Sequence, residues 1–240
     1  LPAYGGPEAM YRTMVEREPL NPAGHVGLAA ALTEQGRLDE ALAMLDRAQA
    51  IDPHLAAIYV GRARVAAQRG AWDLVLAESG RALEVDPELQ SGHLLRAVAL
   101  MRLKRLGEAG QVLERLRARY PGHPEVATVW AQYLMATGRY AEALPLLQAA
   151  ARLLPGEPSL WDAIGVASAR LGRGEEARAA FQRTVAITPG YLDGWLRLAA
   201  ICQTLGDAPG REAALQHAQG LPGGAERVAG FRRTLGAGAP

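Results

Sequence analysis

Apolar residues recur at steps of three and four along most of the chain, which is the spacing of one face of an α-helix. In the segment 22–35 this face holds Leu28, Ala31, Leu32 and Gln35. In the segment 38–51 it holds Leu38, Ala41, Leu42, Leu45, Ala48 and Ile51. The pattern predicts a pair of helices over these two segments, joined by a short turn.

This pair of segments is repeated along the chain. The stretch GRLDEALAMLDRAQAIDP, residues 36–53, returns in similar form as GRYAEALPLLQAAARLLP, residues 138–155. Proline recurs every 34 residues, at Pro19, Pro53, Pro87, Pro121, Pro155 and Pro189. Glycine keeps the same spacing, with Lys104 as the one exception, at Gly36, Gly70, Gly138, Gly172 and Gly206. A fixed period of this length is typical of a solenoid built from tandem units.

Each recurring residue has a physical role in a pair of helices. The glycine between the helices can adopt a left-handed backbone conformation and end the first helix. The closing proline lacks an N–H group and restricts the residue before it, so it ends the second helix. Small residues let the paired backbones approach closely. They recur in the first helix at Ala29, Ala63, Ala97, Ala131, Gly165 and Ala199, and in the second at Ala41, Ala109, Ala143 and Ala177.

The unit from Trp161 to Pro189, WDAIGVASARLGRGEEARAAFQRTVAITP, resembles the tetratricopeptide repeat, a helix–turn–helix unit of about 34 residues. The residues that match the family positions are Trp161, Ile164, Gly165, Ala177, Phe181 and Pro189, while Ser168 replaces the usual tyrosine. The segment WLRLAAICQTLG, from Trp195, repeats the first half of the signature. The resemblance implies an all-α, right-handed α-solenoid of six units, 20–53, 54–87, 88–121, 122–155, 156–189 and 190–223.

The two ends depart from this pattern. Residues 1–19 are expected to form an N-terminal half-repeat or cap, because 7–18 match only a second helix, with Met10 and Met14 on one face. In the sixth unit Pro209 and Gly210 stand where the second helix should begin, so we expect that helix to start late and to end by Gly220. Residues 224–240 are expected to supply a C-terminal capping helix with a linker-like tail, GAGAP. Its apolar face comprises Val228, Phe231 and Leu235.

Composition argues against several classes of function. Hydrophobic residues make up 49% of the chain and charged residues 21%, which is enough apolar content to bury a core. The net charge is +1 and no basic run exceeds a few residues, so no nucleic-acid partner is expected. No apolar stretch approaches the roughly 20 residues that cross a bilayer, so no direct membrane insertion is expected. The sequence leaves open a cytoplasmic or a periplasmic location, and its start at Leu1 suggests a processed product or a piece of a longer chain.

Catalytic and metal-binding motifs give weak signals. His25 and His93 share one repeat position, but two units separate them, which is too far for a shared metal ion. Cys202 stands where the family often has tyrosine and is expected to be a buried apolar residue. The glycine-rich segment 220–230 lacks the Lys-Ser/Thr ending of a phosphate-binding loop, so we expect a linker. No catalytic constellation, cofactor or metal site is predicted.

The resemblance implies a binding surface on the first helix of each unit, which in this family lines a concave groove that holds a peptide. Carried over position by position, the groove presents Val26, Ala30 and Glu34, then Val60, Arg64 and Gln68, then Leu94, Val98 and Arg102, then Thr128, Gln132 and Met135, then Asp162, Val166 and Arg170, and finally Leu196, Ala200 and Gln203. The lysine and asparagine set with which some members hold a C-terminal carboxylate is missing. The residues predicted to bind a partner are Arg62, Arg64, Gln68, Leu94, Arg96, Val98, Arg102, Gln132, Met135, Asp162 and Arg170.

Two of these residues, Arg62 and Arg96, break the apolar pattern. They stand at the leucine position of the repeat, where the other units have Leu28, Trp130, Ile164 and Leu198. One interpretation is that their aliphatic stems pack and their guanidinium groups reach the solvent. The other is that they join Arg64 and Arg102 in a basic subsite for a carboxylate or a phosphate. The sequence leaves both interpretations open.

Two classes of function fit these observations. The first is a non-catalytic scaffold that binds a partner protein or peptide, as bacterial members of the family do when they assemble envelope machines, pili or enzyme complexes. We expect an acidic segment of the partner to lie against Arg64 and Arg102, with apolar anchors near Leu94, Val98 and Met135. The second is the recognition domain of a larger enzyme, for example a sulfotransferase or an oxygen-dependent hydroxylase, whose catalytic domain lies outside residues 1–240. Self-association is compatible with either.

Overall fold

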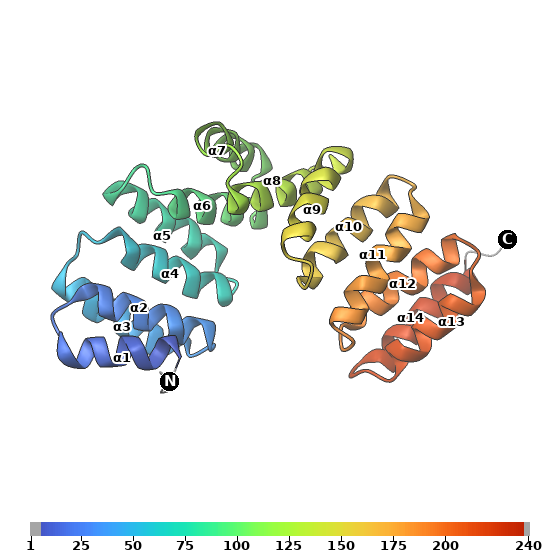
Figure 1. Cartoon of the computed structure of the whole chain (residues 1–240), viewed down its shortest axis with the longest axis horizontal. Helices are drawn as coiled ribbons and strands as arrows, with labels where there is room; N and C mark the ends of the chain where they lie inside the picture. The colour runs from blue at the N-terminus through green and yellow to red at the C-terminus, as the bar shows by residue number, and fades with distance from the viewer. Residues whose placement is uncertain (1–5, 238–240) are drawn as a thin grey trace. The chain divides into compact units, whose positions relative to one another are not determined.

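The computed structural model describes residues 6–237, which form fourteen α-helices and no strand (Figure 1). The helices are α1 (Pro7–Arg17), α2 (Pro22–Glu34), α3 (Leu38–Ile51), α4 (Ala56–Gln68), α5 (Trp72–Val85), α6 (Gln90–Arg102), α7 (Leu106–Arg119), α8 (Pro124–Ala136), α9 (Tyr140–Leu153), α10 (Pro158–Arg170), α11 (Gly174–Ile187), α12 (Leu192–Thr204), α13 (Ala208–Gln219) and α14 (Gly224–Ala237). The predicted all-α fold of helix pairs is confirmed. The chain divides into two compact units, Leu1–Val129 (unit 1) and Trp130–Pro240 (unit 2).

We call α2, α4, α6, α8, α10 and α12 the first helices and the helices that follow them, α3 to α13, the second helices. The turn between a first and a second helix contains one residue with a left-handed backbone. Gly36 has a φ of 77°, and Gly70, Gly138, Gly172 and Gly206 share this conformation. Lys104 takes the place of glycine between α6 and α7 and still has a φ of 62°. The fold imposes this conformation even on a residue with a side chain, at a cost of about 1–2 kcal/mol.

A ring near the start of most first helices ties the helix to the proline that closes the preceding repeat. A ring nitrogen or hydroxyl oxygen lies 2.8–3.0 Å from the proline carbonyl oxygen and donates a hydrogen bond to it, the histidines as Nε2–H tautomers. The pairs are His25–Pro19, Tyr59–Pro53, His93–Pro87, Trp161–Pro155 and Trp195–Pro189. The bond satisfies a carbonyl group just beyond a helix end. It gives His25 and His93 a structural role.

Small residues stand where the two helices of a pair cross. The alanines at this position are at most 1% exposed, as the sequence predicted: Ala29, Ala63, Ala97, Ala131 and Ala199. In α10 the position is Gly165, and a Cβ atom there would lie 2.5 Å from Cε1 of Phe181. Phe181, on α11, is 3% exposed. The absence of a side chain at Gly165 therefore makes room for an aromatic ring in the core.

In unit 1, α1 packs on the first repeat through Tyr11 and Val15, which contact the core of that repeat. Of the two methionines expected on the apolar face, Met14 is half-buried and lies against Gly24 of α2, whereas Met10 is 55% exposed. The reason lies in α2. A Cβ atom at Gly27 would lie 2.2 Å from Cε1 of Tyr11, so the ring lies directly over this glycine. The larger ring buries more apolar area there than a methionine at position 10 would.

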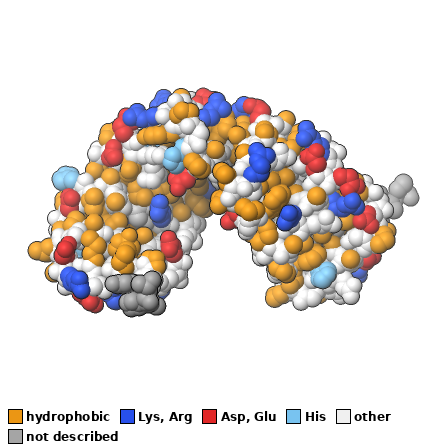
Figure 2. Space-filling view, in the orientation of Figure 1, with side chains coloured by type: hydrophobic (Ala, Val, Ile, Leu, Met, Phe, Trp, Pro, Cys, Tyr) orange, Lys and Arg blue, Asp and Glu red, His pale blue; other side chains and the backbone are white. Residues whose placement is uncertain are grey.

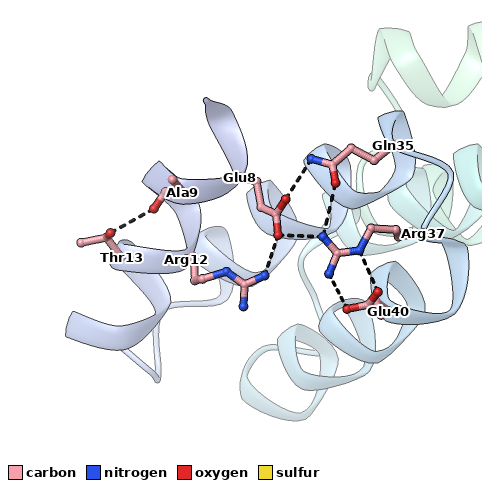
Figure 3. Close-up of polar contacts among 7 residues, drawn as sticks. All are labelled: Glu8, Ala9, Arg12, Thr13, Gln35, Arg37 and Glu40. Atoms are coloured by element: carbon pink, nitrogen blue, oxygen red, sulfur yellow. Dashed lines mark hydrogen bonds and ion pairs between the residues drawn. The ribbon is translucent and has the colours of Figure 1, made fainter. Parts of the chain in front are cut away.

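Polar contacts also hold α1 against the turn between α2 and α3 (Figure 3). The carboxylate of Glu8 accepts hydrogen bonds from Arg12 at 2.5 Å, Gln35 at 2.9 Å and Arg37 at 2.9 Å. Arg37 also donates two hydrogen bonds to Glu40, at 2.7 and 2.6 Å. The hydrogen bonds from Arg12, Gln35 and Arg37 lower the pKa of Glu8 to about 2. The N-terminal helix is therefore attached through an ionised carboxylate as well as through Tyr11.

In unit 2, the last pair of helices is covered by α14. Its Val228 is 2% exposed and belongs to a core formed with residues of α11, α12 and α13, among them Cys202 and Leu215. Phe231 packs against the same core. This is the covering role expected of a terminal helix in a solenoid. The side chain of Leu235 and residues 238–240 of the expected tail lie outside the described residues.

The expected late start of the second helix in the sixth repeat is wrong, because α13 begins at Ala208. Pro209 falls in the first turn, where a missing N–H group costs no hydrogen bond and the fixed φ suits a helix. The amide of Gly210 donates to the Asp207 carboxylate at 2.9 Å, which caps the helix. The helix ends at Gln219, in line with the expected end by Gly220.

Candidate partner-binding surface

The first helices of unit 1 form a continuous layer, since α2 contacts α4 and α4 contacts α6. Side chains from consecutive repeats therefore come together on it. Arg64 and Gln68 on α4 and Arg102 on α6 are exposed, and Val98 is half-buried. Leu94 is only 7% exposed, so it belongs to the core and offers little surface as an apolar anchor. The layer presents mainly cationic and polar groups.

The two arginines of this layer have different surroundings. The guanidinium carbon of Arg102 lies 5.1 Å from the centroid of the Trp72 ring. An arginine over an aromatic face is attracted by the ring and keeps its N–H groups available at its edge. Arg64 has no hydrogen-bond or ion-pair partner among residues 6–237. Both guanidinium groups can therefore bind an acceptor supplied from outside.

Arg62 and Arg96 do not join Arg64 and Arg102 on this layer. Arg62 Nη2 lies 2.6 Å from Asp46 Oδ1 on α3, a second helix, and the Arg62 side chain is 19% exposed. Arg96 lines a groove between α5 and α7, which are also second helices. The structure thus divides the four arginines into an exposed pair on the first helices and a half-buried pair that faces the second helices.

In unit 2, the predicted binding residues are less concentrated. Gln132 on α8 and Arg170 at the end of α10 are exposed, and Met135 is half-buried. Asp162 on α10 forms an ion pair with Arg197 of α12, and its second carboxylate oxygen is buried without a hydrogen-bond partner in the described structure. Arg197 therefore already neutralises the one acidic residue predicted to bind a partner.

A second aspartate–arginine ion pair joins α12 to α14 in unit 2. Asp193 of α12 pairs with Arg227 of α14. Between the two pairs, burial raises the pKa of Tyr191, and the nearby Asp162 carboxylate raises it further. Consecutive first helices and α14 are thus linked by a ladder of aspartate–arginine pairs. In each pair the arginine neutralises the charge of the aspartate.

Over the face drawn in Figure 2, basic and acidic side chains are interspersed in both units.

None of the helices within residues 6–237 combines the length and the apolar character needed to span a bilayer. In the same range, no three His, Cys, Asp or Glu side chains gather in a way that would hold a metal ion. Cys202 is 2% exposed, and burial raises the pKa of its thiol.

Sequence reasoning missed the ring-to-proline hydrogen bonds and the ion pairs between repeats. A signal for the first was present, because His25, Tyr59, His93, Trp161 and Trp195 all stand at one position of the 34-residue period. The ion pairs could have been sought by comparing charged positions one repeat apart. Neither feature interrupts the helical periodicity, so neither is visible in the apolar pattern alone.

Models of the tetratricopeptide repeat match residues 8–64, 60–124 and 128–191. None of the curated proteins compared with the chain matches it.

Several solved structures share the fold. The chain is similar to a chain of the APC/C hetero-tetramer Cut9–Hcn1, with a TM-score of 0.83 and 14% sequence identity. The match covers 92% of this chain and 44% of that chain. It is similar to PilW, described as a widely conserved type IV pilus biogenesis factor, with a TM-score of 0.73 at 18% identity over 82% of this chain and 92% of that one. It is also similar to YrrB, described as a TPR protein with an unusual peptide-binding site, with a TM-score of 0.52 at 21% identity over 77% and 95%. At these identities the likeness concerns the fold alone.

Proposed function

The chain belongs to the tetratricopeptide repeat family, and from this membership we propose that it is a non-catalytic scaffold that binds a partner protein through its first helices. The observation that carries the proposal is the position of Arg64 and Arg102. Both are exposed, and they come from first helices that contact each other. Neither forms an ion pair within residues 6–237.

The chemistry of this pair favours an acidic segment of the partner. A guanidinium group binds a carboxylate through two parallel N–H···O bonds, which sets both position and orientation. The Trp72 ring holds one face of the Arg102 guanidinium, so less side-chain freedom is lost on binding. The half-buried Val98, four residues before Arg102 on the same helix, adds apolar area. Aspartate or glutamate next to an apolar side chain would complement this surface.

Two of the structural relatives support a role in protein assembly. One is described as having a peptide-binding site and another as a pilus biogenesis factor. We propose that this chain likewise contributes to the assembly of a bacterial multiprotein complex. No step of this role requires a catalytic group or a cofactor.

The test begins with affinity capture and mass spectrometry to identify a partner, followed by measurement of its affinity by calorimetry at low and high salt. Arg64→Ala and Arg102→Ala should each weaken binding about tenfold at low salt, and less at high salt, because exposed charges are screened. Arg47→Ala, an exposed arginine on the second helix α3, is the matched control and should bind like the wild type. Unchanged affinity in both test variants at both salt concentrations would remove the binding site from the first helices of unit 1.

A further inference from the structure

Arg62 and Arg96 occupy the same position in consecutive repeats, but only Arg62 has a carboxylate partner. Arg62 bonds to Asp46 of α3 at 2.6 Å. The residue at the position of Asp46 in the next repeat is Gly80, on α5. A Cβ atom at Gly80 would lie 3.9 Å from Nη1 of Arg96, so this guanidinium group faces the place that the missing carboxylate would fill.

A groove opens beside Arg96. It has a volume of about 520 Å³ and lies between α5 and α7, with α6 beneath it. Leu83, Val112 and Leu116 give it apolar walls, and the arginines that line it are Arg96, Arg115 and Arg119. This volume lies within the range of small-ligand sites, so it suits a few side chains of a peptide rather than a whole helix.

The charges that face this groove do not cancel. Two glutamates line it, and each already has an arginine partner, in the pairs Glu88–Arg119 and Glu108–Arg105. Neither Arg96 nor Arg115 has a hydrogen-bond or ion-pair partner in the described part of the chain. Arg96 lies close enough to Glu108 to lower the pKa of that carboxyl, but neither Arg96 nor Arg115 has a bonded acceptor within residues 6–237, so both can bind a carboxylate supplied from outside.

We propose that this groove binds a carboxylate of a partner peptide, an aspartate or glutamate side chain next to an apolar residue. Arg96 and Arg115 are the ligands of the carboxylate, and the half-buried Leu83 and Val112 contact the apolar residue. The partner supplies the acceptor that Asp46 supplies to Arg62 within the chain. The site lies between the second helices α5 and α7, with Arg96 supplied by α6, and it does not rest on Arg64 or Arg102.

The equivalent groove in unit 2 lacks this particular pair of arginines. It lies between α9 and α11, and Ile164 stands at the position of Arg96. The residue at the position of Arg115 is Arg183, whose guanidinium carbon lies 5.7 Å from the centroid of the Trp161 ring. Arg152 also lines the groove in unit 2, so that groove is cationic too, but it has no arginine at the position of Arg96.

The test uses the full chain and two fluorescein-labelled peptides, acetyl-Leu-Asp-Leu-Asp-Leu and the same peptide with asparagine in place of aspartate, measured by fluorescence anisotropy. The aspartate peptide should bind at least tenfold more tightly than the asparagine peptide. Arg96→Leu places at this position the leucine found in the first and sixth repeats, so it should fold and still lose at least tenfold in affinity. Arg115→Ala should lose affinity as well. Arg62→Leu and Arg183→Ala are matched controls and should bind like the wild type.

Substitutions at Gly80 test the proposal most directly. Gly80→Asp rebuilds the internal ion pair seen at Asp46 and should reduce peptide affinity at least tenfold. Asparagine has nearly the same volume as aspartate but no charge. Gly80→Asn should therefore bind the peptide with an affinity within about threefold of that of the wild type. Equal losses in these two variants would show that bulk alone blocks the groove, and equal binding of the two peptides would show that charge is not recognised. Either result would overturn the proposal, as would unchanged binding in Arg96→Leu.

Discussion

Replacing Gly165 by alanine should destabilise unit 2, although alanine favours a helix more than glycine does. The gain from helix propensity is about 1 kcal/mol. Against it, the new Cβ atom would lie 2.5, 2.6 and 2.8 Å from three ring atoms of Phe181, which is buried and cannot turn aside freely. Overpacking of this kind costs about 1–3 kcal/mol. Because three ring atoms are involved we take the upper half of this range, which leaves a net loss of about 1–2 kcal/mol.

The other repeats show how the clash can be relieved. At the positions of Gly165 and Phe181 the second repeat has Ala63 and Ser79, and the other four combine alanine with leucine, in the pairs Ala29–Leu45, Ala97–Leu113, Ala131–Leu147 and Ala199–Leu215. Phe181→Leu alone should leave a cavity and cost about 1–2 kcal/mol. The double variant has the alanine–leucine combination of four other repeats and should return to within about 0.5 kcal/mol of the wild type. The two substitutions should therefore be strongly coupled.

The assay is urea unfolding followed by far-ultraviolet circular dichroism for the wild type, both single variants and the double variant. Repeats can unfold separately, so hydrogen exchange of α10 and α11 should be measured beside it to locate the change. The coupling should be about 2 kcal/mol or more, with exchange increased in these two helices in both single variants. Simple addition of the two losses in the double variant would refute the contact between Gly165 and Phe181.

Two further predictions concern the core of unit 2 and the N-terminal helix. Ala143 is fully buried, so Ala143→Leu should overpack its helix pair, cost about 1–3 kcal/mol and lower the urea midpoint, whereas an unchanged midpoint would contradict this packing. The pKa of Glu8 is lowered from 4.5 to about 2, so its stabilising contribution is fully present above pH 4.5 and is lost as the pH falls toward 2. Amide chemical shifts of α1 should report its detachment over that pH range. Glu8→Gln lacks the ionised carboxylate and should lose this pH dependence. Identical titrations of the wild type and Glu8→Gln would argue against this role of Glu8.

The helix pairs could be predicted from the sequence because their signals are local. A glycine that permits a left-handed turn and a proline that ends a helix act within a few residues of their own positions. The errors arose where a distant residue decides the outcome. Tyr11 rather than Met10 faces the core because Gly27 on another helix leaves room for a ring. Pro209 was interpreted as a helix breaker, although Asp207 caps the helix and puts this proline in the first turn.

The candidate sites divide in the same way. Repeat position alone was enough to predict that Arg64 and Arg102 would be exposed. It could not predict which arginines find an internal acceptor, because that depends on the reach of side chains from neighbouring helices. The difference between Asp46 and Gly80 is visible in the sequence once the repeats are aligned, but its meaning requires the position of the Arg96 guanidinium group.

Lys104 gives the chain an unusual experimental property. It is the sole lysine in the sequence, and it is exposed in the turn between α6 and α7. Its backbone is fixed by hydrogen bonds from the amides of Lys104 and Arg105 to the carbonyl groups of Met101 and Leu100. A protease specific for lysine therefore has one cleavage site, and cleavage requires this turn to open. The rate of this single cleavage therefore measures how often the turn between α6 and α7 opens. These are the two helices that supply Arg96 and Arg115.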